Sequence, residues 1–232
     1  MRRDKMKVKV TTDLLISLYS KLDKLYPWQR RWYNHRFERN RYLHKGRQIG
    51  SSYFFALEGL LDACLTGRNK VYISHVCEPD DEFISNEMEI VKCFLGIESN
   101  NPVTKIELDN GAVLYFLPES LKSWVDIIGD IYVSEWSWFQ DLYYIVSLVK
   151  SVSLNKKWRR TFYSSRSKLD NGHIVDNDYF KHHKIFDEET YWDVVPSINM
   201  ECYNFLNMEN IRNNMGDDYF NEMILCQFNG NY

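Results

Sequence analysis

Helical and strand patterns alternate along this chain of 232 residues, and this alternation is the feature that most limits the folds open to it. Apolar residues at helical spacing, such as Phe54, Leu57 and Leu61, precede a short apolar run at 71–74, and similar changes recur further on. Such alternation is typical of a mostly parallel sheet with helices on both faces. We expect helices at 12–25, 29–36, 53–65, 82–95, 142–152, 203–213 and 217–228, and strands at 40–44, 71–74, 105–108, 112–117, 131–134 and 160–164.

The composition excludes several classes of protein. Hydrophobic residues make up 44% of the chain and aromatic residues 16%, which excludes a disordered chain. No apolar run approaches the roughly 18 residues of a membrane-spanning helix, and Asp13 interrupts the first apolar stretch, so no secretory signal is expected. The five cysteines are scattered without a Cys-x-x-Cys pair, which indicates neither a disulfide framework nor a zinc site. We therefore expect a cytoplasmic protein.

Charge is distributed unevenly along the chain. Residues 27–47 carry seven Lys or Arg and one acidic residue, Glu38, as expected where a protein contacts phosphate groups. A solvated basic surface is the other interpretation of such a run. Residues 187–232 carry nine acidic residues and one basic residue, which indicates an acidic helical extension. We expect a helical segment at 1–25, a core at 26–186 and this extension after it.

A glycine-bearing loop, Lys45-Gly46-Arg47-Gln48-Ile49-Gly50-Ser51-Ser52, separates an expected strand from an expected helix. Backbone N–H groups and a helix N-terminus at such a junction can bind phosphate. Compared with the pattern G-x-x-x-x-G-K-[ST], Ser51 occupies the lysine position and Lys45 stands at the first glycine. Lys45 can still reach the β and γ phosphates, and Ser52 keeps the hydroxyl that binds Mg²⁺. An ordinary turn is the alternative interpretation of the spacing.

A carboxylate follows the expected strand at 131–134. Glu135 lies where phosphate-loop ATPases place a glutamate that orients and deprotonates the attacking water. Ser134 stands where these enzymes place a metal-binding Asp, and loss of that carboxylate should weaken Mg²⁺ binding, because hard cations favour charged oxygen ligands. A strand end with a solvated glutamate is the alternative.

Two further short motifs suggest contacts with a nucleotide. Ser164 and Ser165 follow the expected strand at 160–164, and their hydroxyls can report the state of the γ-phosphate. In the turn Tyr26-Pro27-Trp28-Gln29, an amide can read an adenine edge while an aromatic ring stacks on the base. Each motif is weak alone, since an aromatic residue next to Pro more often belongs to the core.

In this order, the motifs together resemble the ATPase domain of the large terminase subunit of tailed bacteriophages, in the temperate-phage branch with a lysine-first Walker A loop. Thr-Gly-Arg-Asn at 66–69, Asn-Gly-Ala-Val-Leu-Tyr-Phe-Leu at 110–117 and Lys-Trp-Arg-Arg-Thr at 157–161 add to the resemblance. It extends from about Leu25 to the end of the chain. The resemblance implies a P-loop NTPase fold of the ASCE type, with ATP and Mg²⁺ as ligands, and a motor that couples ATP hydrolysis to translocation of double-stranded DNA into a procapsid.

The resemblance also implies a role for each matching residue. Glu135, Lys45 and Arg47 would be catalytic, and Ser164 and Ser165 would couple hydrolysis to motion. Ser52 would bind Mg²⁺, with Ser134 in place of the expected Asp. The residues implied to bind the nucleotide are Tyr26, Trp28, Gln29, Lys45, Gly46, Arg47, Gln48, Ile49, Gly50, Ser51 and Ser52.

The resemblance further implies partners: non-specifically bound double-stranded DNA, a terminase small subunit, the portal of a procapsid and further copies of the chain on that portal. No membrane partner is implied. Large subunits of this family continue into a nuclease domain that this sequence does not include, so no DNA cleavage is expected from it. Ser134 leaves open a second hypothesis, a terminase-like protein that binds nucleotide or assembly partners without turnover. A helicase of the same architecture ranks third.

Overall fold

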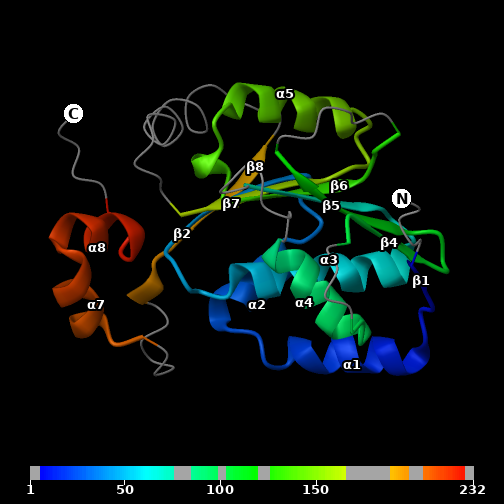
Figure 1. The fold of residues 1–232 in the computed structure, drawn as a ribbon, viewed down its shortest axis with the longest axis horizontal. Coiled ribbons are helices and arrows are strands. Elements are labelled where there is room, and N and C mark those ends of the chain that lie inside the picture. Colours follow the sequence, from blue (N-terminus) through cyan, green and yellow to red (C-terminus); the bar gives the residue numbers. More distant parts are fainter. Residues whose placement is uncertain are drawn as a thin grey trace.

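The computed structural model describes residues 6–75, 85–98, 103–119, 126–165, 189–198 and 206–227. Within these ranges the strands join in a single eight-stranded sheet (Figure 1). The strands are β1 (Met6–Val8), β2 (Asn40–Lys45), β3 (Lys70–Ser74), β4 (Lys105–Leu108), β5 (Val113–Pro118), β6 (Asp130–Ser134), β7 (Arg160–Ser164) and β8 (Thr190–Val195).

The order of the strands across the sheet is β1-β4-β5-β3-β6-β7-β2-β8. From β5 to β8 in this order, all neighbouring strands run parallel. β4 is antiparallel to β5, as the Asn110-Gly111 turn predicts, and β1 is parallel to β4. The prediction of a mostly parallel sheet is confirmed. Because β7 lies between β2 and β6, the carboxyl ends of these three strands meet at one edge.

The helices form layers on both faces of the sheet, as Figure 1 shows. Four of them, α1 to α4, cover one face and α5 covers the other. α7 and α8 lie beside the loop that follows β2, where Arg47 N–H donates to the Met223 carbonyl. The described helices are α1 (Thr12–Leu22), α2 (Pro27–Asn34), α3 (Ser51–Thr66), α4 (Asn86–Leu95), α5 (Leu142–Val152), α7 (Met208–Met215) and α8 (Asp217–Met223), with the short 3₁₀ helix η1 at Trp136–Trp138.

The core has one cluster on each face of the sheet. Along β6, Ile131 and Val133 pack against α5, whereas Tyr132 packs on the opposite side against α3. This alternation follows from the two-residue period of a strand. α3 is buried along most of its length, which explains why its sequence is apolar over more than one helical stripe.

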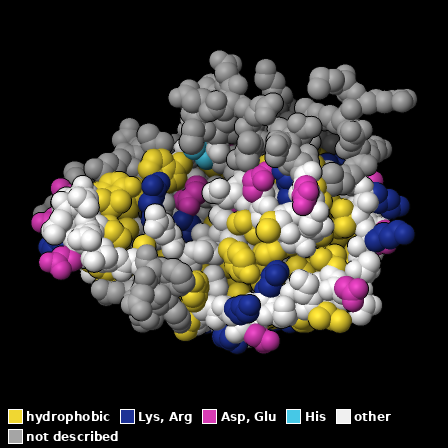
Figure 2. Space-filling view, turned by 60° about the horizontal axis from the view of Figure 1, so that its bottom comes forward, with side chains coloured by type: hydrophobic (Ala, Val, Ile, Leu, Met, Phe, Trp, Pro, Cys, Tyr) yellow, Lys and Arg dark blue, Asp and Glu magenta, His cyan; other side chains and the backbone are white. Residues whose placement is uncertain are grey.

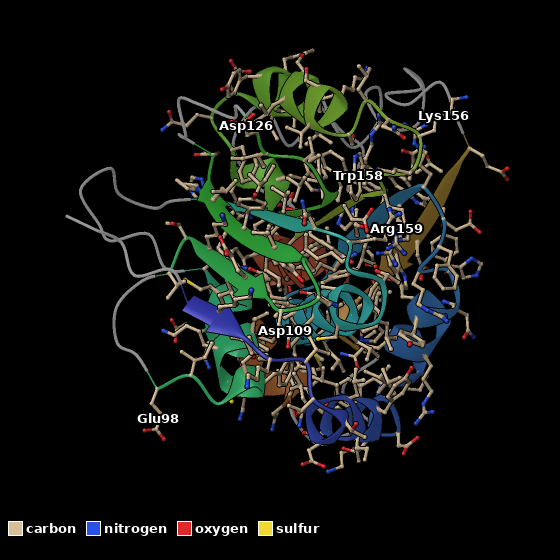
Figure 3. All side chains as sticks on the ribbon, turned by 90° about the vertical axis from the view of Figure 1, so that its right-hand side faces the viewer. Glu98, Asp109, Asp126, Lys156, Trp158 and Arg159 are labelled. Atoms are coloured by element: carbon tan, nitrogen blue, oxygen red, sulfur yellow. The ribbon has the colours of Figure 1, made fainter. Side chains whose placement is uncertain are left out.

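A buried ionic cluster closes the opposite edge of the sheet, at the amino ends of the strands. Asp130 accepts hydrogen bonds from Lys70 Nζ at 2.6 Å and from Arg159 Nη2 at 2.7 Å. Asp62 and Arg68 complete the cluster, and Arg159 lies near this edge in Figure 3. Burial alone would raise the pKa of Asp130, but the surrounding cations hold it well below its ordinary value.

The structure differs from the sequence prediction at two strands. β1 was not expected, because three residues are too few to show a period. β8 lies in the segment expected to be helical, so that segment is corrected to a strand followed by α7 and α8. The run Thr190–Val195 is rich in aromatic and β-branched residues, which favour a strand. The prediction followed the acidic character of the whole segment 187–232 instead. The parts of the expected helices at 82–84, 203–205 and 228 lie outside the described residues.

None of the helices in the described ranges combines the length and the apolar character that crossing a membrane requires.

Candidate functional site

The predicted site residues meet at the carboxyl edge of the sheet. Lys45 is the last residue of β2, Glu135 follows β6, and Ser165 follows β7. Because β7 pairs in parallel with both of the other strands, their ends lie side by side. Three motifs far apart in the sequence thus form one site, as the parallel topology predicts.

The loop 45–52 adopts a conformation that depends on glycine. Gly50 has a φ of +77° and caps the N-terminus of α3, a left-handed conformation that costs other residues energy. Gln48 also has a positive φ, 60°. Within the described residues, no side chain caps α3 and its first turn contains no acidic residue. The positive end of this 16-residue helix therefore faces the loop without a competing carboxylate.

The end of β8 and the segment after it hold the first half of this loop. Gly46 N–H donates to the Val195 carbonyl at 2.8 Å, and Ser197 Oγ donates to the Arg47 carbonyl at 2.6 Å. A Cβ at Gly46 would lie 2.2 Å from Ser197 Oγ, so only glycine fits there. Sequence reasoning missed Ser197, because nothing local links it to a loop 150 residues earlier.

An ion pair joins the loop to the carboxylate after β6. Lys45 Nζ lies 2.5 Å from Glu135 Oε1, with the lysine side chain 4% exposed and the glutamate side chain 36% exposed. Burial raises the pKa of Glu135, but the Lys45 charge and the hydrogen bonds from Lys45 and Ser165 outweigh it and lower the pKa below its ordinary value. Glu135 is therefore held as a carboxylate.

The serines after β7 hold the second oxygen of this carboxylate. Glu135 Oε2 accepts hydrogen bonds from the backbone N–H and the Oγ of Ser165, both at 3.0 Å, and from Ser164 Oγ at 3.3 Å. Ser137 Oγ lies 2.7 Å from Ser164 Oγ and donates to the Ser165 carbonyl at 2.5 Å. The serine pair thus touches the carboxylate directly. Sequence reasoning missed Ser137, which stands in η1 without a motif around it.

Arg47 reaches across the loop toward the segment that follows Glu135. Its guanidinium carbon lies 5.3 Å from the centroid of the Trp138 ring, within the range of a cation–π contact. The residue is exposed, so its guanidinium stays accessible at the rim of the site.

The turn before α2 packs behind the loop. Gln29 is 2% exposed, its Oε1 accepts from Tyr26 N–H at 3.0 Å, and its Nε2 donates to the Gly50 carbonyl at 3.2 Å. Trp28 is 3% exposed and packs edge-on against Phe54. Tyr26 is half-buried beside Gly50. The structure therefore gives Gln29 a second role, as a tie between the turn and the loop, while adenine contact by these residues stays a prediction.

The remaining loop residues begin α3. Ile49 is buried in the core cluster next to this helix, which anchors the loop. Ser51 is buried, and Ser52 is half-buried in the first helical turn. A role of the Ser52 hydroxyl in Mg²⁺ binding stays a prediction.

The strand end at Ser134 contains an unexpected partner. Ser134 Oγ donates to Glu87 Oε1 at 3.1 Å, and Tyr163 donates to the same oxygen at 2.8 Å. Glu87 lies in the first turn of α4 and is 1% exposed. Sequence reasoning missed Glu87, because a glutamate near a helix start is common.

Part of the basic run at 27–47 is paired with acidic residues, so the run is not a continuous solvated basic surface, while its contact with phosphate stays a prediction. Arg41 is buried and pairs with Glu58 at 2.5 Å, and Arg31 pairs with Asp193 at 2.7 Å. On the face in Figure 2, basic side chains lie in separate places among hydrophobic and acidic ones. Opposite charges that are distant in sequence neutralise part of this run.

Known proteins share sequence similarity with most of this chain. A family model described as "Terminase large subunit, T4likevirus-type, N-terminal" matches residues 42–228. "Probable terminase, ATPase subunit" of Haemophilus phage HP1 is 28% identical over 147 residues, covering 63% of this chain and 24% of that protein. "Terminase, ATPase subunit" of Escherichia phage P2 is 28% identical over 149 residues, covering 63% of this chain and 25% of that protein. The chain thus spans about a quarter of the length of these relatives.

Two solved structures share the fold. The HK97 bacteriophage large terminase superimposes with a TM-score of 0.53 at 13% identity, covering 75% of this chain and 40% of that one. A variant of the Thermus phage P74-26 large terminase ATPase domain also gives a TM-score of 0.53, at 11% identity, covering 82% of this chain and 89% of that one. Together with the strand order, these likenesses confirm the predicted P-loop NTPase fold.

Proposed function

The chain belongs to the family of T4-type large terminase subunits, of which it matches the N-terminal part, and on this premise we propose that it is the ATP-hydrolysing part of a viral DNA-packaging motor. The names of its relatives from phages HP1 and P2 as terminase ATPase subunits support this proposal.

One observation carries the proposal. Lys45, on the loop before α3, and Glu135, after β6, form a 2.5 Å ion pair across the end of β7. A cation for phosphate and a carboxylate for water are the two groups that ATP hydrolysis needs close together. An ordinary strand-to-helix turn needs neither.

The phosphates of ATP bind to the loop 45–52. The N-terminus of α3 supplies backbone N–H groups, and Lys45 exchanges Glu135 for the β and γ phosphates. Tyr26, half-buried beside Gly50, contacts the adenine, with Trp28 and Gln29 packed behind it.

The residues present fit Mg²⁺ as the metal. Among the described residues, no three His, Cys, Asp or Glu side chains converge into a metal cage, and Mg²⁺ is typically held by one or two carboxylates together with substrate phosphates and water. Ser52, half-buried in the first turn of α3, would hold the ion with its hydroxyl. The ion would neutralise charge on the transferred phosphate.

Glu135 acts on the attacking water. Release of Lys45 to the phosphates frees Oε1, while Ser164 and Ser165 keep Oε2 in place. The carboxylate can then orient the water and take its proton. Lys45 and Arg47 stabilise the charge that develops on the γ-phosphate, which is the larger part of catalysis in this class of reaction. Ser164 is the last residue of β7 and Ser165 follows it. Their contacts with Glu135 therefore link the presence of the γ-phosphate to the position of this strand.

The motor acts on double-stranded DNA in the cytoplasm of the bacterial host. Contacts with the phosphate backbone are sufficient to bind the DNA, because the motor must translocate DNA of any base sequence. A small terminase subunit, a procapsid portal and further copies of this chain on that portal complete the assembly.

Steady-state ATP hydrolysis with Mg²⁺ tests the proposal, with and without double-stranded DNA. We expect turnover that DNA stimulates and that Glu135→Gln lowers by about 10²-fold or more, because the amide cannot take the proton. Glu38→Gln is the control, since Glu38 has an exposed side chain and precedes the amino end of β2, whereas the loop follows its carboxyl end, so the change should have no effect. Turnover that persists in Glu135→Gln would contradict the assignment.

Ser134 favours a second candidate, a relative that binds nucleotide or assembly partners without turnover. The strand end carries a hydroxyl where this class of enzyme has a metal-binding carboxylate. Calorimetric ATP binding combined with no hydrolysis under any DNA condition would favour this second candidate over the motor.

A further inference from the structure

A carboxylate from another element lies at the position that Ser134 leaves without charge. Glu87 Oε1 is 3.1 Å from Ser134 Oγ, and Ser134 directly precedes Glu135. Replacing a serine by aspartate extends the side chain by about one carboxylate group. The glutamate of α4 therefore places its carboxylate next to the position at which an aspartate at Ser134 would carry its own.

Ser134 faces the same side of the sheet as the phosphate loop. Tyr132, two residues earlier on β6, belongs to the core cluster under α3, and so does Leu43, two residues before Lys45 on β2. Because side chains two apart in a strand share a face, Ser134 and Lys45 both point to the side of α3. α4 packs on the same side, so Glu87 reaches the strand end from the helix layer that carries the loop.

The hydrogen-bond partners of Glu87 among the described residues are neutral hydroxyls. It is 1% exposed, and the groups that donate to it are the hydroxyls of Ser134 and Tyr163, with Ser74 Oγ at 3.5 Å from Oε2. In the part of the chain that the structure describes, no Lys, Arg or His forms an ion pair with it. Buried carboxylates are normally paired with a cation or bound to a metal, and the N-terminus of α4 offers only partial positive charge.

We propose that Glu87 is the carboxylate that holds the nucleotide-bound Mg²⁺ in this protein, supplied by α4 in place of the aspartate missing at Ser134. The inference rests on the proposed function, because the ion it serves arrives with ATP. Ser134 and Tyr163 position the glutamate through their hydroxyls. A terminase-type ATPase can on this account keep its metal despite a serine at the strand end.

Metal binding is measured directly, with Mn²⁺ as a paramagnetic probe in the presence of a non-hydrolysable ATP analogue. We expect Glu87→Gln to raise the Mn²⁺ concentration for half-saturation by about 10- to 100-fold, while metal-free binding of the analogue stays unchanged. Glu89→Gln is the matched control, because Glu89 lies on the same helix with a half-exposed side chain paired to Lys92.

The double variant Glu87→Gln/Ser134→Asp returns the carboxylate to the strand. We expect it to restore Mn²⁺ affinity to within a few-fold of the parent chain, which a structural role of Glu87 would not predict. Circular dichroism verifies that each variant is folded. Parental Mn²⁺ affinity in Glu87→Gln, or a loss that Ser134→Asp fails to restore in the folded double variant, would overturn the proposal.

The same titrations separate failure of this inference from failure of the proposed function. If the parent chain binds neither the analogue nor Mn²⁺ with it, the proposed function fails and the assignment of Glu87 with it. If the parent binds both and Glu87→Gln equals Glu89→Gln, only the assignment of Glu87 fails.

Discussion

Lys45 Nζ and Glu135 Oε1 lie 2.5 Å apart, although ninety positions separate the two residues in the chain. The lysine side chain is almost fully buried, whereas the glutamate side chain keeps about a third of its surface exposed. The ion pair holds both side chains in place at the end of β7. On the proposed function, this lowers the cost of organising them when ATP binds.

Removing the charge of Lys45 should abolish most of the ATPase activity. We expect Lys45→Met to lower ATP turnover by about 10²-fold or more, because the phosphate loses its main cationic partner. Lys92→Met is a matched control: Lys92 is equally buried and pairs with Glu89 at 2.8 Å, but it lies on α4. Steady-state hydrolysis with Mg²⁺ is the measurement, and an equal loss in both variants would reveal a general effect of replacing a buried lysine.

Ser165 should act on turnover rather than on nucleotide affinity. Its hydroxyl donates to Glu135 Oε2 at 3.0 Å, so Ser165→Ala loosens the carboxylate and should lower kcat by about 10-fold with KM nearly unchanged. Ser165→Thr keeps the hydroxyl and should recover most of the activity. Ser151→Ala removes a comparable hydroxyl on α5, which bonds the Ser147 carbonyl, and should have no effect on kcat. A parallel rise in KM would argue against positioning.

Gly50 and Gly111 allow the conformation of the loop to be tested against a matched turn. Both have positive φ, +77° and +94°, so each change to Ala should cost about 1–2 kcal/mol of unfolding free energy. Only a Cβ at Gly50 meets a neighbour, Gln29 Nε2 at 3.2 Å; at Gly111 nothing lies within 4 Å. We expect Gly50→Ala alone to weaken ATP binding in calorimetry. Equal ATP affinity in both variants would indicate that the loop does not take part in ATP binding.

The buried ionic cluster around Asp130, at the edge of the sheet opposite the candidate site, should contribute strongly to the free energy of unfolding. Asp130→Asn leaves Lys70 and Arg159 without a full partner, and we expect a loss of about 3–5 kcal/mol in urea unfolding at neutral pH. The exposed Asp126, in a left-handed turn that Asn also tolerates, is the control and should stay within about 0.5 kcal/mol.

The stability gained from Asp130 should depend on pH in a defined direction. Its pKa is lower in the folded state than the unfolded value of about 3.9. The contribution is therefore complete above the unfolded pKa and decreases as the pH falls toward the folded value. The difference between the parent chain and Asp130→Asn should be constant from about pH 8 to about pH 5 and shrink below about pH 4. A difference that grows in acid would contradict this sign.

Most of the fold followed from local sequence patterns. The helix at 142–152 and the strand at 160–164 have the bounds that periodicity predicts, and the turn at Asn110-Gly111 joins antiparallel strands as expected. Glu135 lies near the loop 45–52 because β2, β7 and β6 are parallel neighbours that end at one edge. β8 was missed, because its charge resembled that of the helical residues after it.

The partners of the site residues could not be predicted in the same way. Glu87, Ser137 and Ser197 each touch the site through one side chain, and no short motif surrounds them. Their roles depend on how α4, η1 and the segment after β8 pack, which is a property of the whole fold. Likewise, the charges of Arg31 and Arg41 are balanced by Asp193 and Glu58, acids outside the basic run.

The position of β2 between β7 and β8 determines when the site can form on the ribosome. β2 is made near the start of the chain, but the strands that flank it are residues 160–164 and 190–195. The nascent strand therefore keeps both hydrogen-bonding edges unpaired until β7 and β8 have been synthesised. Pairings of such large sequence separation are slow to form and leave unpaired edges exposed to aggregation. The strand that carries Lys45 is synthesised well before its two neighbours and completes its pairing only after both of them.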